Sequence, residues 1–136
     1  MTLEDIKETF SLFTDWEDKY RYIIELGKEL PELSDKDKIP SNLIRGCQSQ
    51  VWLIYEISSE KHLQMHIDSD AHIVRGLIAI VLASLNNRTA SQVLEFDVES
   101  LFKELELMEH LSPTRGNGLR SMVGQIKTVA ESALLS

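Results

Sequence analysis

The sequence predicts an α+β fold in which one small antiparallel β-sheet packs against helices. Every second residue from Val51 to Ile57 is apolar, a period typical of a β-strand. A similar alternation from His62 to Asp68 follows a short polar turn, which favours an antiparallel hairpin. Apolar residues at helical spacing precede and follow the hairpin, so helices should cover the sheet.

The length of 136 residues favours a single domain, residues 1–136, that is long enough to bury a core. Its 43% hydrophobic and 26% charged residues are typical of a globular protein. No apolar run reaches the length of about 18 residues that a membrane span needs. The N-terminus lacks the features of a secretory signal, and a single cysteine fits a reducing compartment, so we expect a cytoplasmic protein.

The net charge of −8 argues against nucleic-acid binding, because the 14 basic residues are not concentrated in any stretch. An acidic surface serves solubility or steers the chain towards a basic patch on a protein partner. One cysteine is also too few for a zinc site built from several thiolates, and we expect no metal site.

Two helices are expected before the hairpin. The first, residues 2–13, begins with a capping box formed by Thr2 and Asp5. Thr14 is expected to cap the second helix, which Pro31 ends. A polar loop follows before the first strand.

The second strand should direct Leu63 and Met65 inwards and Asp68 outwards. Ser69 or Asp70 should then cap a helix that is apolar almost all round and therefore central and buried.

Several shorter elements are expected in the C-terminal third. Thr89 with Gln92 opens a short helix, and Asp97 opens another that reaches about Met108. Pro113 breaks the chain, and a Gly-rich loop over residues 114–118 leads into the last helix. Arg115 would lie on this loop, where it serves no need of the helix and could neutralise a thiolate or bind a partner's carboxylate.

Cys47 is the only cysteine and lies in the segment Arg45-Gly46-Cys47-Gln48-Ser49-Gln50-Val51-Trp52. A thiol reacts as its thiolate, and the guanidinium of Arg45 would favour this form. Gly46 removes one side chain, so a partner's backbone could approach closely. The alternative is a buried cysteine that acts as a small hydrophobe. The polar neighbours favour a reactive thiol on a loop before the first strand.

The histidines suggest two other sites. His62 and His66 share one face of a strand and could bind a metal weakly, although solvated histidines are the ordinary outcome. His110 is a conceivable base for Cys47 in a cysteine-dependent hydrolase.

The segment around Cys47 resembles the G-C-Q-S-Q-V-W signature of the SufE/CsdE family of sulfur acceptors. Further similar blocks occur in the same order and cover most of the chain: residues 16–20 with 23–27, 68–71 with 73–77, and 110–115 with 118–119. The resemblance implies an α+β fold similar to that of IscU-type scaffolds.

The resemblance also implies an activity. Such proteins take sulfane sulfur from the persulfide of a PLP-dependent cysteine desulfurase of the SufS/CsdA type, stimulate that enzyme and pass the sulfur to an iron–sulfur scaffold or another acceptor. They act as accessories to the desulfurase and hold no cofactor of their own. Cys47 corresponds to the acceptor, and the remaining site residues correspond to partner-binding positions: Arg45, Gly46, Gln48, Ser49 and Gln50 in the loop, with Asp70 and Arg115 outside it.

A persulfide is easily lost to other thiols, so we expect the apolar pairs Leu43-Ile44 and Val51-Trp52 to shelter Cys47 in the free protein. Three alternatives remain: a non-catalytic adaptor that only binds the desulfurase, the hydrolase with His110, and an iron–sulfur scaffold. The scaffold ranks lowest, because one cysteine cannot supply the usual four thiolates.

Overall fold

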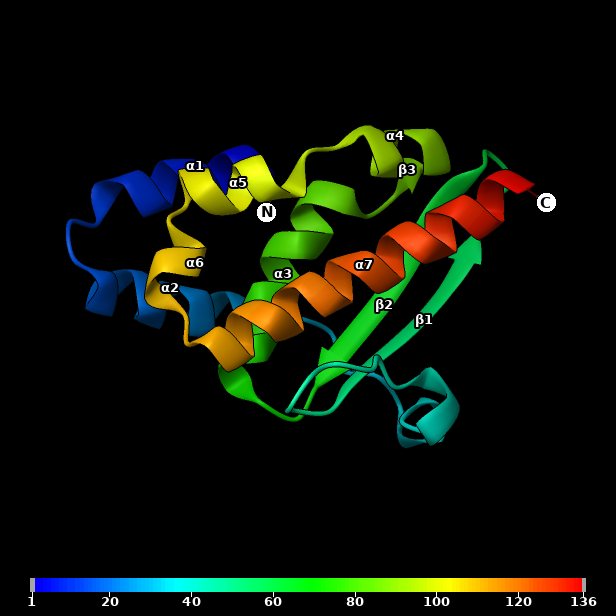
Figure 1. Cartoon of the computed structure of the whole chain (residues 1–136), viewed down its shortest axis with the longest axis horizontal. Coiled ribbons are helices and arrows are strands. Elements are labelled where there is room, and N and C mark those ends of the chain that lie inside the picture. The colour runs from blue at the N-terminus through cyan, green and yellow to red at the C-terminus, as the bar shows by residue number, and fades with distance from the viewer. Residues whose placement is uncertain (1, 136) are drawn as a thin grey trace.

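The computed structural model describes residues 2–135 of the chain and confirms the α+β class. Seven α-helices, two 3-10 turns and three strands follow one another in this part of the chain (Figure 1). The elements are α1 (Leu3–Leu12), α2 (Trp16–Lys28), η1 (Asp35–Asp37), η2 (Pro40–Asn42), β1 (Val51–Ile57), β2 (His62–Ser69), α3 (His72–Leu85), β3 (Arg88–Thr89), α4 (Ala90–Glu95), α5 (Val98–Glu104), α6 (Leu107–His110) and α7 (Pro113–Leu135).

The sheet has the order β1-β2-β3 and is antiparallel throughout. In the predicted hairpin, Val51 pairs with Ser69 and Ile57 with Leu63. The two-residue strand β3 was not predicted, because its side chains carry no alternation that a sequence could reveal. At its other edge β1 receives only one bridge, between Leu43 and Trp52, within the described residues.

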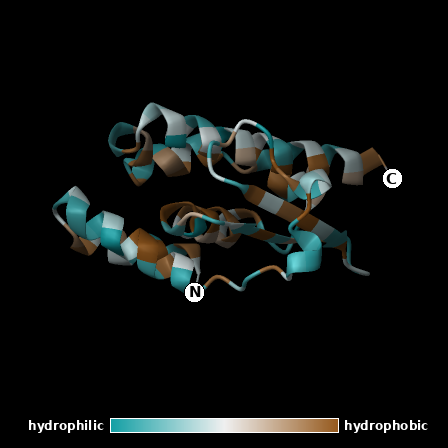
Figure 2. Ribbon diagram, turned by 90° about the horizontal axis from the view of Figure 1, so that it is seen from below, coloured by the Kyte–Doolittle hydropathy of each residue, from teal (hydrophilic) through white to brown (hydrophobic). Residues whose placement is uncertain are grey.

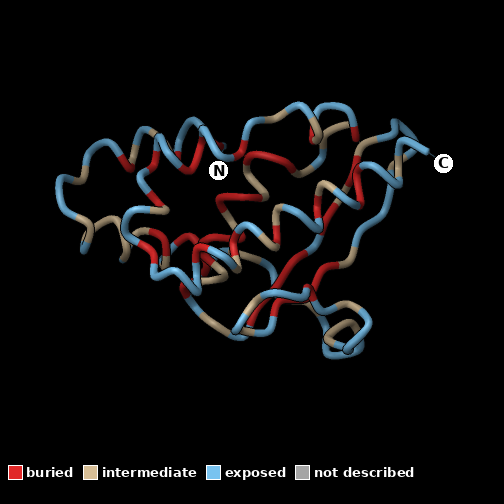
Figure 3. Tube along the Cα trace, in the orientation of Figure 1, coloured by how far each residue is buried: buried red, intermediate tan, exposed pale blue. Residues whose placement is uncertain are grey.

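Helix α3 is the central helix, as predicted. Figure 2 shows it, largely brown, in a middle layer between α7 and the N-terminal helices. Eight of its residues are buried, and it packs against both α2 and β2. Burial falls along β1, from Val51 at 1% exposed to Tyr55 at 48% (Figure 3), so the apolar face predicted for this strand is covered only near the cysteine loop.

The helix starts were predicted with mixed success. Thr2 and Asp5 form the expected capping box, as do Thr89 and Gln92. Asp15 rather than Thr14 caps α2, since its carboxylate accepts from the backbone N–H of Asp18 at 2.9 Å.

The start of α3 differs from the prediction. Its N-cap is Ala71, whose side chain makes no capping bond. Instead the Ser69 hydroxyl accepts from the N–H of Ala71, and the Asp70 carboxylate accepts from the N–H of Gln50. Asp70 therefore serves the cysteine loop rather than the helix.

The C-terminal third departs most from expectation. Glu106, with φ +57°, separates α5 from α6, so the single helix expected up to Met108 is two. Helix α7 begins at Pro113, because a proline fits the first helical position, where its missing N–H has no partner to lose. Residues 114–118 are therefore helical, and Arg115 lies in the first turn of α7 rather than on a loop.

Asp68 was predicted to face outwards but is only 1% exposed. Its carboxylate is paired with the guanidinium of Arg75 and accepts from the backbone N–H groups of Leu33 and Ser69 at 3.1 and 2.8 Å. Lys38 lies 3.7 Å away. Arg75 also donates from Nε to the carbonyl of Gly27 at 3.2 Å. The alternation of β2 could not reveal this burial, because the covering groups come from the segment after α2 and from α3.

We expect Asp68→Asn to lower the free energy of unfolding by about 3–5 kcal/mol, the usual cost of breaking a buried ion pair. The amide of the Asp68→Asn variant cannot neutralise the charge of Arg75, and its NH2 group would face N–H donors that the Asp68 carboxylate accepts from. Urea unfolding measures the effect, with Asp35→Asn in the exposed η1 turn as the control, expected within about 0.5 kcal/mol of wild type. Equal stability of the two variants would contradict the organising role of Asp68.

Candidate functional site

Residues 45–50 form a loop that is closed at its base. The N–H of Ile44 donates to the carbonyl of Val51 at 2.8 Å, and Leu43 bridges to Trp52. Ile44 is buried, which anchors the start of the loop in the core. The loop therefore leads into β1 at a defined point, in agreement with the predicted loop before the first strand.

Gly46 lets the loop lie against α7. Its φ is +89°, a conformation that other residues rarely adopt, and a Cβ here would lie 2.4 Å from the Ser121 hydroxyl oxygen. The glycine was expected to admit a partner's backbone. In the free chain it admits α7 instead.

Cys47 is half-buried against the same helix. Its thiol donates a hydrogen bond to the carbonyl of Gly118, with Sγ and oxygen 3.4 Å apart. Burial raises the pKa of the Cys47 thiol, because the thiolate is the form that loses solvation. The free chain therefore holds a protonated, sheltered thiol.

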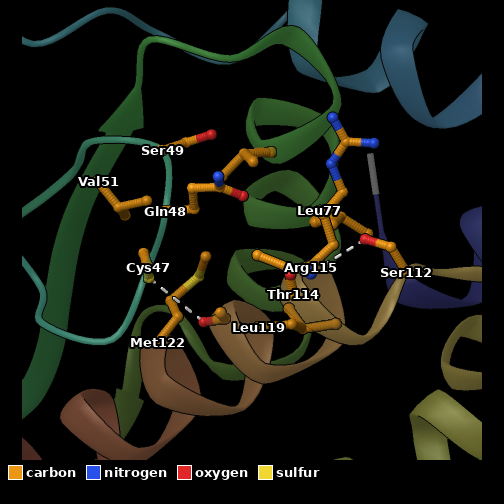
Figure 4. Close-up of a pocket in the computed structure, with 12 residues that line it drawn as sticks. Cys47, Gln48, Ser49, Val51, Leu77, Ser112, Thr114, Arg115, Leu119 and Met122 are labelled. Carbon is orange, nitrogen blue, oxygen red and sulfur yellow. Dashed lines mark hydrogen bonds between the residues drawn. The ribbon is translucent and has the colours of Figure 1, made fainter.

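A pocket of about 300 Å³ opens beside the sulfur, between the cysteine loop, α3 and α7 (Figure 4). Its apolar wall is formed by Val51, Val74, Leu77, Leu119 and Met122. Its polar lining comes from Gln48, Ser49, Ser112, Thr114 and Arg115. Of the four apolar residues expected to shelter Cys47, only Val51 lines this pocket. The others were chosen for nearness in sequence, whereas α3 and α7 provide most of the wall.

Neither candidate arginine contacts the sulfur. Arg45 is exposed and has no hydrogen bond or ion pair with the described residues. Figure 4 shows the Arg115 guanidinium at the opposite end of the pocket from Cys47. There its Nη1 donates to the Tyr20 hydroxyl at 3.4 Å. The activation of the thiol expected from Arg45 is therefore absent from the free chain.

Asp70 holds the other side of the loop. Its Oδ1 accepts from the N–H of Gln50 at 3.1 Å, while its own N–H donates to the carbonyl of Gln50 at 3.3 Å. These two bonds extend the β1–β2 hairpin by one residue pair and restrain the strand that leaves the loop.

The histidines take no part in the pocket. The His110 ring is stacked on Trp16, with centroids 4.6 Å apart and planes inclined by 14°, and it does not line the cavity beside Cys47. Within residues 2–135, the group of potential metal ligands that come close together is Glu106, Glu109 and His110, all exposed. His62 and His66 lie outside it, so their suggested site gains no third ligand.

Comparison with known proteins decides the family. A family model described as the SufE Fe-S metabolism associated domain matches residues 4–130. The chain belongs to the SufE family. It is therefore a member of a family associated with iron–sulfur metabolism, as the sequence around Cys47 predicted.

Curated SufE-like relatives span nearly the whole chain. An uncharacterized SufE-like protein of Rhizobium etli is 47% identical over 133 residues, covering 96% of this chain and 90% of that protein. An uncharacterized SufE-like protein of Rhizobium meliloti is 45% identical over 136 residues, covering 98% and 97%. The fold also matches the solution structure of a hypothetical protein from Thermus thermophilus, with a TM-score of 0.77, 17% identity and full coverage of both chains. No helix of the described SufE chain is long and apolar enough to cross a membrane.

Several site residues were missed by sequence reasoning: Val74 and Leu77 on α3, and Gly118, Ser121 and Met122 on α7. The apolar members of this set lie in segments that are predicted to be helices, but no local pattern links those segments to residue 47. With α7 starting at Pro113, Gly118 lies in the helix, on the same side as Ser121 and Met122. A correct helix start at Pro113 is therefore the feature of the sequence that would group these three residues.

The raised pKa of Cys47 predicts slow alkylation by iodoacetamide in the folded protein, slower than in the urea-unfolded chain at the same pH. The rate should rise with pH along a curve displaced to higher pH relative to the unfolded chain. Because the pKa of Cys47 is higher in the folded protein than in the unfolded chain, the protonated thiol favours the folded state. This contribution to stability is fully present below the pKa of the thiol in the unfolded chain and is lost as pH rises through its pKa in the folded protein. Identical rate profiles for folded and unfolded protein would contradict the shelter.

Asp70→Ala should loosen Gln50 and raise the alkylation rate of Cys47 several-fold, because the loop loses the carboxylate's bond to the N–H of Gln50 and keeps only the backbone bond to its carbonyl. The cost in stability should be about 1 kcal/mol, that of one hydrogen bond. Glu56→Ala, an exposed carboxylate on β1, is the matched control and should alkylate like wild type. A thermal melt beside the alkylation assay separates loop release from general unfolding.

Proposed function

We propose that this SufE-family chain accepts sulfane sulfur on Cys47 from the persulfide of a PLP-dependent cysteine desulfurase, stimulates that enzyme and passes the sulfur to an iron–sulfur scaffold or another acceptor. The observation that carries the proposal is the single thiol on the family's signature loop beside a pocket with an apolar wall. The family's association with iron–sulfur metabolism supports an iron–sulfur scaffold as a destination of the sulfur.

Sulfur transfer needs a thiolate, access and a docked donor. The Cys47 thiolate attacks the outer sulfur of the desulfurase persulfide, the donor S–S bond breaks, and the donor cysteine leaves as a thiolate. The product is a persulfide on Cys47. The proton that Cys47 loses must pass to a base or to water as the thiolate forms.

The free chain meets only part of this need. Its thiol is protonated, half-buried and bonded to the carbonyl of Gly118. Docking must therefore break this bond and expose the sulfur to the donor. The restraints to be released are few: the bond to Gly118, the packing of Gly46 on Ser121, and the bonds between Asp70 and Gln50.

The pocket suits the product. A persulfide on Cys47 carries one more sulfur than the thiol, and the cavity of about 300 Å³ beside Sγ has room for it. Its apolar wall would shield the outer sulfur from water and from other thiols until an acceptor docks.

The partner-binding role proposed for the remaining residues agrees with their exposure. All of them are exposed except Ser49, which is half-buried: Arg45, Gly46, Gln48, Ser49, Gln50, Asp70 and Arg115. The hydrolase alternative loses its support, since His110 is stacked on Trp16 and does not line the pocket.

Mixing the protein with a purified cysteine desulfurase and cysteine should add one sulfur, ~32 Da, to Cys47 by mass spectrometry, because transfer leaves a persulfide. Cys47→Ser should gain no mass and should not stimulate the desulfurase. Full stimulation by Cys47→Ser would identify the protein as a non-catalytic adaptor, and a wild-type chain that gains no sulfur would refute the proposal.

A further inference from the structure

The arginines of the chain differ in their partners. Three of the six are paired with carboxylates, Arg21 with Glu17 and Asp18, Arg75 with Asp68, and Arg120 with Glu99, and Arg88 lies over the ring of Phe96. Arg45 and Arg115 have no carboxylate partner among residues 2–135, although the chain contains 22 acidic residues. Both belong to the cysteine site, one in the loop and the other at the far end of the pocket.

Arg115 nevertheless has an assigned position. Its Nη1 donates to the hydroxyl of Tyr20 on α2, 3.4 Å away. A phenol oxygen is a neutral acceptor, so it orients the guanidinium without neutralising it. The remaining N–H donors are left for a group outside this chain, and a planar guanidinium matches a carboxylate best.

Tyr20 is itself held firmly. It packs against the hydrophobic core and is half-buried. Four residues earlier on the same face of α2, Trp16 stacks on His110 at the end of α6. Figure 1 shows α2, α6 and the start of α7 next to one another. Two contacts, Trp16 with His110 and Tyr20 with Arg115, thus join α2 to the corner between α6 and α7. The contact with Tyr20 holds the Arg115 side chain in place.

We infer that Tyr20 is a positioning residue that pre-orients Arg115 to receive a carboxylate of the docked cysteine desulfurase. This inference rests on the proposed function and names the chemistry of the partner's contact. A long exposed arginine loses side-chain entropy when a partner immobilises it, and a bond made in advance reduces that loss. Docking at Arg115 would place the partner over the pocket at whose other end Cys47 lies.

The test measures desulfurase activity as a function of the concentration of this protein. Tyr20→Phe should raise the half-saturating concentration about fivefold, the worth of one hydrogen bond, and leave the maximal rate unchanged. Tyr55→Phe makes the same chemical change on exposed β1 and should match wild type. In an Arg115→Ala background Tyr20→Phe should have no further effect, because the two residues act as one unit.

Ionic strength tests the carboxylate. The half-saturating concentration of wild type should rise with salt, and less steeply for Arg115→Gln. Arg120→Gln is the matched control on the same helix and should keep the wild-type slope, because Arg120 is paired with Glu99. Equal slopes for Arg115→Gln and wild type would overturn the carboxylate as the partner group.

Two results would overturn the role of Tyr20: a wild-type curve for Tyr20→Phe, or equal effects of Tyr20→Phe with and without Arg115. If Tyr20→Phe has a lower melting temperature than wild type, Arg115→Lys replaces it in the test. Lysine keeps the charge but lacks the planar guanidinium that can bond to Tyr20 and to a carboxylate at the same time. A wild-type activation curve for Arg115→Lys would overturn the inference. A wild-type chain that neither stimulates the desulfurase nor gains sulfur would refute the proposed function and this inference together. Normal stimulation with an unaffected Tyr20→Phe would refute the inference alone.

Discussion

The buried carboxylate of Asp68 is the constraint on which the site depends. It joins the end of β2 to α3 through Arg75, and to the segment after α2 through Leu33 and Lys38. That segment leads directly into the cysteine loop. Ser69 and Asp70, the next two residues, bond to the start of α3 and to Gln50. The buried Asp68 carboxylate thus holds the segment that leads into the cysteine loop, and it lies two residues before Asp70, which bonds to Gln50 at the other end of that loop.

The proposed sulfur transfer would place two opposed requirements on the site. The thiol would have to react with its donor and yet not react elsewhere. The free chain meets the second requirement, since burial raises the pKa of Cys47 and a hydrogen bond turns the sulfur towards α7. Under the proposed function, the reactivity of Cys47 would arise when the donor docks. The loop suits this change, because residues 45–50 are restrained by a few hydrogen bonds, the packing of Gly46 on Ser121 and the partial burial of Cys47.

Helix α7 links the two ends of the site. Its first turn carries Arg115, and its next turns carry Gly118, which accepts the bond from Cys47, and Ser121, on which Gly46 packs. A partner that holds the start of this helix also holds the surface on which the cysteine loop lies. Helix α2 contacts the start of α7 through Tyr20 and the end of the preceding α6 through Trp16.

The sequence by itself determined the α+β class, the hairpin, the central helix and the identity of Cys47 as the candidate acceptor. These follow from alternation, helical spacing, capping pairs and one distinctive segment, all of which are local. Only the tertiary structure decided that Asp68 is buried, that Asp70 ties down Gln50, that α3 and α7 form the wall beside the sulfur, and that Tyr20 holds Arg115. Each depends on residues 20 or more positions apart. The free energies of these burial and pairing interactions arise only when folding brings distant segments together, so no local sequence pattern can reveal the interactions.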